Sequence, residues 1–169
     1  MAAIAWLLGG GVAFYLVFFV FFPLARGALY DPSSPVQTSL MVDLADVRPG
    51  EKAADLGSGD GRVLIALAGR GAEAHGYEVN PVLVLLSRRN IRRAGLERKA
   101  FVHWRSFWRA DFSPFSLITV FQVDFVMGRL ETKLKRELPD GARIVSHHWR
   151  FLDWPPEKVR GDMYLYRLG

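Results

Sequence analysis

Hydrophobic and polar residues follow one another along this chain in a pattern that predicts one long apolar segment and then a series of short strands and helices. The apolar segment covers residues 4–25, and no charged side chain precedes Arg26. As a helix it would extend roughly 33 Å, enough to cross a bilayer core of about 30 Å. A cleaved signal peptide has a basic start and a shorter apolar core, so we expect an uncleaved transmembrane helix at residues 1–26.

Residues 27–50 are expected to connect this helix to a domain at residues 51–169. The run Tyr30-Asp31-Pro32-Ser33-Ser34-Pro35 is predicted to be a linker, because its two prolines exclude a regular helix. Apolar residues then recur at helical spacing from Val36 to Val47, and Pro49-Gly50 ends the pattern. One amphipathic helix is therefore predicted before the domain.

The domain alternates between runs typical of strands and runs with helical periodicity. Strands are predicted to end at Asp55 and to cover residues 73–79, 101–104, 116–122, 142–149 and 163–167. Helices are predicted to begin at Val63, Pro81 and Arg129. This alternation predicts an α/β fold, a mostly parallel sheet with helices on both faces. The last strand follows too closely for a crossover helix, so we expect it to be antiparallel at or near the edge.

The run from Ala53 to Arg62, Ala-Ala-Asp-Leu-Gly-Ser-Gly-Asp-Gly-Arg, is the strongest indication of function. Its three alternating glycines let the backbone turn sharply after a strand and come close to a bulky ligand. The spacing is neither the G-x-G-x-x-G of dinucleotide enzymes nor a P-loop. Asp55 would repel a pyrophosphate, so the loop favours a ligand with a cationic end, such as S-adenosylmethionine.

A second acidic residue supports that ligand. Glu78 lies at the end of the next predicted strand, and ligands of open α/β sheets bind outside the carboxyl ends of the strands. A carboxylate there can accept hydrogen bonds from both ribose hydroxyls. Together Asp55 and Glu78 predict a site for S-adenosylmethionine.

Composition and charge narrow the chemistry further. The chain contains no cysteine, which excludes a disulfide framework, a thiolate nucleophile and Cys-ligated zinc. The net charge of +5 suits an anionic surface, either nucleic acid or lipid. Arg88, Arg89, Arg92 and Arg93 are predicted to lie on the exposed face of a helix, where anionic headgroups could bind. By the positive-inside rule, Arg26 and the basic domain place the catalytic domain on the cytoplasmic side of the membrane.

These motifs resemble a known family. Asp55-Leu-Gly-Ser-Gly-Asp-Gly-Arg62 and Gly76-Tyr-Glu-Val-Asn-Pro81 resemble class I S-adenosylmethionine-dependent methyltransferases, which have a Rossmann-like fold. With the apolar N-terminal segment, Phe107-Trp108 and Trp154-Pro155, the chain is similar to the small membrane-anchored lysine methyltransferases that modify the ATP synthase c-subunit and the adenine nucleotide translocase. The short length suggests a prokaryotic member.

The resemblance implies roles for individual residues. It implies cofactor contacts at Asp55, Gly57, Ser58, Gly59, Glu78, Asn80, Ser106 and Phe107. The family tends to have Asp or Asn where this chain has Ser106, and a proline loop where it has Gln122-Val123-Asp124. The first difference affects recognition of the adenine amino group, and the second affects the acceptor side.

A lysine acceptor must lose its proton before it can take a methyl group, which costs about 4–5 kcal/mol at pH 7. The candidates to receive that proton are Tyr30, Asp124, and His147 or His148. Each also has a structural interpretation: an interfacial anchor, a helix N-cap, and packed or solvated strand residues. We expect no metal site, since His147 and His148 are adjacent on a strand and point to opposite faces.

Several functions therefore stay open. The preferred one is a membrane-anchored methyltransferase that modifies a lysine of a membrane protein. A small-molecule or lipid methyltransferase and a non-catalytic membrane scaffold are the alternatives. A nucleic-acid amino methyltransferase is less consistent with the residues, because Asp/Asn-Pro-Pro-Tyr/Phe is missing after the fourth strand. We therefore expect no nucleic-acid partner.

Overall fold

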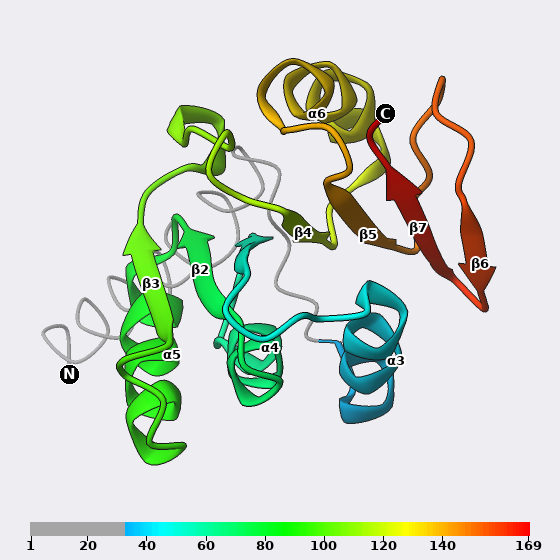
Figure 1. Ribbon diagram of the computed structural model, residues 1–169. Coiled ribbons are helices and arrows are strands. Elements are labelled where there is room, and N and C mark those ends of the chain that lie inside the picture. The colour runs from blue at the N-terminus through cyan, green and yellow to red at the C-terminus, as the bar shows by residue number, and fades with distance from the viewer. Residues whose placement is uncertain (1–32) are drawn as a thin grey trace, which may run out of the picture. The chain divides into compact units, whose positions relative to one another are not determined.

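A computed structural model describes residues 33–169 of the chain (Figure 1). The elements in chain order are α3 (Pro35–Ala45), β1 (Lys52–Leu56), α4 (Arg62–Gly69), β2 (Glu73–Glu78), α5 (Pro81–Arg93), β3 (Ala100–Trp104), the 3-10 turn η2 (Phe107–Arg109), β4 (Leu117–Val120), α6 (Asp124–Glu137), β5 (Arg143–His147), β6 (Lys158–Arg160) and β7 (Met163–Arg167). The predicted transmembrane helix and Tyr30 lie outside the described residues. Between residues 33 and 169, no helix has the length and apolar character needed to cross a membrane.

The strands form one seven-stranded sheet in the order β3-β2-β1-β4-β5-β7-β6. The pairs among β1 to β5 are parallel, and β7 runs antiparallel to both β5 and β6. The predicted mostly parallel sheet and its antiparallel last strand are therefore confirmed. The chain proceeds from β1 outward to β2 and β3, then returns to place β4 on the other side of β1. This reversal between β1 and β4 is where open α/β sheets bind ligands.

Helices cover both faces of the sheet, as Figure 1 shows. Alternate residues of a strand point to opposite faces. Thus Leu117 and Val145 pack on the side of α3, α4 and α5, whereas Ile118 and Ile144 pack on the side of α6. The central strands are buried on both faces, which explains their nearly continuous apolar sequence.

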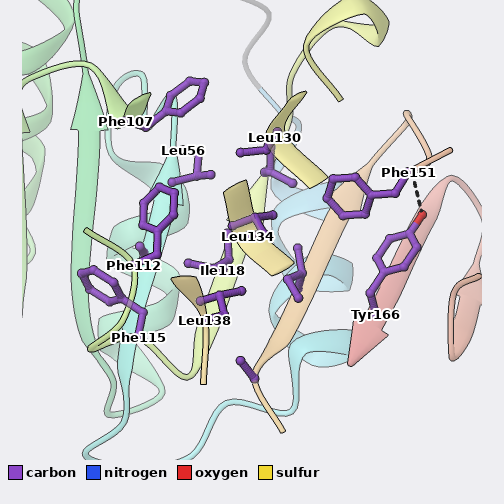
Figure 2. Close-up of a cluster of buried hydrophobic side chains, with 14 of the residues drawn as sticks. Leu56, Phe107, Phe112, Phe115, Ile118, Leu130, Leu134, Leu138, Phe151 and Tyr166 are labelled. Carbon is purple, nitrogen blue, oxygen red and sulfur yellow. Dashed lines mark hydrogen bonds between the residues drawn. The ribbon is translucent and has the colours of Figure 1, made fainter. Parts of the chain in front are cut away.

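The core on the α6 side is rich in aromatic residues (Figure 2). Phe112 and Phe115, from the segment between β3 and β4, pack edge-on against Tyr77 of β2. Across the sheet, the backbone N–H of Phe151 donates a hydrogen bond of 3.2 Å to the hydroxyl of Tyr166. The contacts of Phe112 and Phe115 with Tyr77 hold the segment that follows β3 against the sheet.

Several boundaries differ from the sequence prediction, and one strand was missed. Strand β4 covers Leu117–Val120 rather than residues 116–122, so Gln122 follows the strand. Helix α6 begins at Asp124 rather than Arg129, because Val126 and Met127 are already buried in its first turn. Strand β5 ends at His147, since His148 has a φ of +71° and leaves the extended conformation. Strand β6 was missed because all three of its residues are exposed, so no apolar alternation marks it.

Helix α3 belongs to the helical layer of the domain. It begins with a capping box in which Ser34 and Gln37 exchange hydrogen bonds, and it packs against α4, β5 and β7. At its C-terminal end, the buried Arg143 side chain donates to the carbonyl of Ala45 and forms an ion pair with Glu51. These contacts fix α3 beside the strands that lead into the functional site.

Candidate functional site

The loop between β1 and α4, residues 57–61, is shaped by its glycines. Gly57, Gly59 and Gly61 have φ values of +83°, +54° and +84°, a region that residues with a Cβ rarely adopt. The N–H of Gly57 donates to the carbonyl of Tyr77 at 3.0 Å, which ties the loop to β2. The predicted sharp turn after the first strand is therefore present.

Gly57 also lies at the point where the strand order reverses. A Cβ built on it would come within 2.4 Å of Nε2 of Gln122, the second residue after β4. That amide is fixed, because it donates a hydrogen bond of 3.0 Å to the carbonyl of Leu56. Gln122 thus links the ends of β1 and β4. The sequence marked this residue only as a departure from the family pattern.

Glu78 ends β2 and holds the glycine loop from the side. Its Oε2 accepts from the N–H of Gly59 at 3.0 Å, and its Oε1 accepts from the N–H groups of Val79 and Asn80 at 2.8 Å each. The side chain is only 4% exposed. A carboxylate has about four acceptor positions, so three are used here and one remains for a hydroxyl donor.

Asp55 lies at the same edge, buried beneath the loop. The hydroxyl of Thr119 donates to its Oδ1 at 2.7 Å. Burial raises the pKa of Asp55 to about 7, and the nearby charges of Glu78 and Asp60 add to the rise, while the bond from Thr119 opposes it. A cationic ligand group would stabilise the ionised form of Asp55. The residues present therefore fit a ligand that carries a hydroxyl donor and a positive charge, and the expected bonds from two ribose hydroxyls to Glu78 reduce to one.

Ser58 faces away from this edge. Its side chain lies under the loop, where a Cβ on Gly76 would meet the Ser58 Oγ at 2.5 Å, and that Oγ is buried without a hydrogen-bond partner. Close packing between the loop and β2 thus explains the glycine at position 76. The backbone N–H of Ser58 donates to the carbonyl of Tyr77 at 3.2 Å, so this residue ties the loop to β2.

The segment after β3 begins beside Glu78, since the N–H of Arg105 donates to the carbonyl of Glu78 at 3.0 Å. Asn80 caps α5, since its Oδ1 accepts from the N–H of Val82 at 3.0 Å. Ser106 begins the η2 turn and makes no capping hydrogen bond with its side chain. Phe107 is buried, with its ring centroid 4.8 Å from that of Trp108. Asn80, Ser106 and Phe107 therefore follow neighbouring strands at one edge of the sheet.

Two further residues of the site were not predicted. Asp60 forms an ion pair of 2.7 Å with Arg62, and the guanidinium also donates to the carbonyl of Ser33 before α3. Asn90 of α5 donates to the carbonyl of Asp60 at 2.9 Å. The loop is thus fixed from α3 and α5 at once. No periodic signal in the sequence identifies such contacts, because their partners lie about thirty residues away in the chain.

The described candidates for a proton acceptor differ in environment. Asp124 is exposed and is the first residue of α6; the N-cap position itself belongs to Val123. His147 is 2% exposed, with Nε2 at 3.0 Å from Asp162 and 3.3 Å from Gln37. His148 is exposed and lies after β5 with a φ of +71°, so the alternation of faces expected within a strand does not apply to this pair. Within residues 33–169, no group of acidic and histidine side chains is arranged to hold a metal ion.

A groove of about 590 Å³ lies between α3 and α4. It is lined by Thr38 and Val42 on one side and by Ala66 on the other, and it touches the glycine loop at Asp60, but neither Asp55 nor Glu78 lines it. We therefore locate the ligand crevice by the hydrogen bonds of Glu78 and the glycine loop, not by this groove.

The chain is similar to several known proteins. The family described as "ANTKMT methyltransferase domain" matches residues 55–158. The human ATP synthase c-subunit lysine N-methyltransferase is 39% identical over 131 residues, 78% of this chain and 56% of that protein. The mouse adenine nucleotide translocase lysine N-methyltransferase is 36% identical over 162 residues, 91% and 70% of the two chains. The chain thus spans little more than half of the human relative.

A prokaryotic relative and a solved structure match over most of their length. A protein-lysine N-methyltransferase of Saccharolobus islandicus is 31% identical over 150 residues, 83% of this chain and 93% of that protein. A crystal structure described as an RNA methyltransferase from Salinibacter ruber, in complex with S-adenosyl-L-homocysteine, has a TM-score of 0.76 and 32% identity. The similarity covers 82% of this chain and 92% of that one.

Proposed function

This chain belongs to the ANTKMT methyltransferase-domain family, and from that membership we propose that it transfers a methyl group from S-adenosylmethionine to a lysine side chain of a protein. The family predicted from the Asp55–Arg62 and Gly76–Pro81 motifs is confirmed. One structural observation supports the activity above all others. The buried carboxylate of Glu78 holds the glycine loop and keeps an acceptor position next to buried Asp55.

Each site residue has a distinct part in binding the cofactor. Glu78 would accept from one ribose hydroxyl through its remaining acceptor position, and ionised Asp55 would stabilise the cationic methionine end. Gly57 and Gly59 let the backbone come close to the ligand. Ser106 and Phe107 border the adenine. S-adenosylmethionine supplies the methyl group, so the protein mainly has to position the donor and acceptor and exclude water.

The acceptor lysine must be brought to the same edge and deprotonated. Asp124 is exposed after β4, so its carboxylate can attract a lysine ammonium group. The Nε2 of His147 is instead occupied by Asp162 and Gln37. We therefore assign the first contact with the lysine to Asp124. Desolvation at the crevice lowers the lysine pKa and makes the neutral amine more accessible.

The location that we propose is a membrane. The support is the apolar, uncharged stretch at residues 4–25, followed by Arg26 and a basic domain, for which the positive-inside rule favours the cytoplasmic side. Two relatives are named for acting on the ATP synthase c-subunit and on the adenine nucleotide translocase. We propose a membrane protein as the substrate of this chain as well. Cell fractionation tests the anchor: the protein should stay in the membrane pellet after a carbonate wash, and its release would exclude the anchor.

Labelled S-adenosylmethionine tests the activity. The detergent-solubilised enzyme is incubated with membranes from a deletion strain, in parallel with Glu78→Gln and with Glu97→Gln, an exposed carboxylate at the opposite end of α5. We expect label in a protein band that survives lipid extraction, loss of label with Glu78→Gln, and no loss with Glu97→Gln. Label found only in the organic phase would identify a lipid acceptor and contradict the proposal.

An RNA acceptor is the second candidate, because the 32% identical Salinibacter ruber protein is described as an RNA methyltransferase. The same incubation separates the two candidates. Label on a protein resists ribonuclease and is lost on proteolysis, whereas label on RNA behaves in the opposite way.

A further inference from the structure

The outer face of α5 combines apolar and basic side chains in one stripe. The helix buries Val84, Ser87 and Ile91 against the sheet. Its opposite side carries Val82, Leu85, Arg89 and Arg92 at the spacing of three and four residues that aligns side chains on a helix. Arg88 and Arg93 flank them. We call these six exposed residues the α5 outer face.

The apolar half of this face is large for a surface helix. Leu85 is 65% exposed and Val82 is 46% exposed. Trp104 of the neighbouring edge strand β3 is 66% exposed, and its Nε1–H donates to the carbonyl of Val79 at 3.1 Å. This bond fixes the indole ring beside the start of α5. Side chains of this size grouped on one surface indicate a binding partner with apolar groups.

The basic half carries the charge asymmetry of the whole chain. Residues 88–99 contain six cationic side chains and one acidic side chain, a net +5 that equals the net charge of the full sequence. Among the ion pairs within residues 33–169, none involves Arg88, Arg89, Arg92 or Arg93. The positive charge on this face is therefore available to an anionic partner.

We propose that the α5 outer face, with Trp104, binds an anionic lipid bilayer surface. Arginines meet the phosphates of the headgroups while Leu85, Val82 and Trp104 enter the interfacial region, as in amphipathic helices that lie in a membrane surface. The exposed aliphatic side chains favour a bilayer over RNA, whose backbone offers mostly charged and polar groups. Trp104 of β3 lies opposite Glu78 of β2 in the register of the sheet. Membrane contact at Trp104 therefore turns the edge that carries Glu78 toward the bilayer. The inference goes beyond the proposed activity and does not require it.

The absence of cysteine allows a direct test in the full-length chain. Leu85→Cys and Val159→Cys each introduce one labelling position, and Val159 is 53% exposed on β6, at the other edge of the sheet. Each variant carries a fluorescent label and is reconstituted in nanodiscs of phosphatidylcholine with or without phosphatidylglycerol, with a lipid-borne quencher. We expect strong quenching at position 85 only with phosphatidylglycerol, and little at position 159 in either lipid.

Charge variants and salt separate this contact from any anchor. Replacing Arg88, Arg89 and Arg92 by Gln should weaken the contact about 5-fold per arginine and about 100-fold in total. The control replaces Lys158, Arg160 and Arg167 by Gln at the opposite edge and should leave quenching unchanged. Raising NaCl from about 0.1 M to about 1 M shortens the screening length from about 10 Å to about 3 Å and should also abolish quenching at position 85.

Each other outcome would overturn the proposal. Equal quenching at position 85 in both lipids, or quenching that the triple arginine variant leaves unchanged, would show that the face makes no electrostatic contact with the bilayer. If added RNA shields the fluorophore at position 85 while lipid does not quench it, the face binds nucleic acid instead of a bilayer. The test does not depend on a membrane anchor. If the α5 outer face alone contacts anionic lipid, the label at position 85 is still quenched more strongly than the label at position 159.

Discussion

Replacing Asp55 by Asn should stabilise the protein without ligand and at the same time weaken binding of S-adenosylmethionine. Asp55 is only 6% exposed, and desolvation is the main cause that raises its pKa to about 7. An ionised carboxylate in this position therefore destabilises the folded state unless a cation is bound. Asparagine keeps an oxygen that can accept from Thr119 but carries no charge.

The pKa sets both the size and the pH range of the stability effect. The carboxyl has an ordinary pKa of 3.8 and a pKa of about 7 in the folded protein. Between these two pH values the folded state keeps the carboxyl proton while the unfolded state has lost it. The free energy of unfolding therefore falls as pH rises through this range. At about 1.4 kcal/mol for each pKa unit, the full cost is roughly 4 kcal/mol above pH 7, which is the upper limit of what Asn can recover. Near pH 5 the folded wild type holds the proton while the unfolded chain has mostly lost it, so the difference falls to about 2 kcal/mol, and it disappears only below about pH 3.8.

Thermal unfolding and titration calorimetry measure the two effects. At about pH 8, Asp55→Asn should unfold at a higher temperature, by about 2–4 °C for each kcal/mol recovered. It should bind S-adenosylmethionine about 10- to 100-fold more weakly, because a hydrogen bond or ion pair to a charged group contributes about 1.5–3 kcal/mol. The control, Asp140→Asn, replaces an exposed carboxylate in the turn before β5. Unchanged affinity in Asp55→Asn, or a stability gain that is the same at both pH values, would refute this reasoning.

Two further predictions concern the backbone and the core. Gly57→Ala should cost at least about 1 kcal/mol more stability than Gly141→Ala in urea unfolding. Both glycines have positive φ, but only an alanine at position 57 would bring its Cβ against Gln122. Equal losses in the two variants would exclude this close approach. Arg143→Ala should cost about 3–5 kcal/mol because it leaves buried Glu51 unpaired. The exposed Arg167→Ala should cost less than about 1 kcal/mol, so similar losses in the two variants would contradict the burial of the first pair.

The sequence predicted the elements whose causes are local. The glycines after β1 need positive φ, and that requirement is visible in the residue type itself. Glu78 could be placed at the ligand edge because it ends a strand, and every parallel strand ends at the same edge. The apolar run of β4 was equally clear, because all four of its residues are buried between the two helical layers.

Contacts between distant segments could not be predicted in this way. Gln122 reaches the carbonyl of Leu56 from 66 residues away, and Arg143 reaches Glu51 from 92 residues away. Their side chains show no periodicity, so only the folded arrangement reveals the partners. Strand β6 was missed for a related reason: its pairing with β7 uses backbone groups, while its side chains are exposed.

Binding of S-adenosylmethionine to purified protein tests the central claim most directly. The best variant is Glu78→Gln, because alanine would leave the N–H groups of Gly59, Val79 and Asn80 without an acceptor and could disrupt the loop itself. Titration calorimetry should show saturable binding at one site in the wild type and in Glu97→Gln, and at least about 10-fold weaker binding in a folded Glu78→Gln. No heat with the wild type, or equal affinity in Glu78→Gln, would contradict the assignment of this crevice to the adenosyl donor.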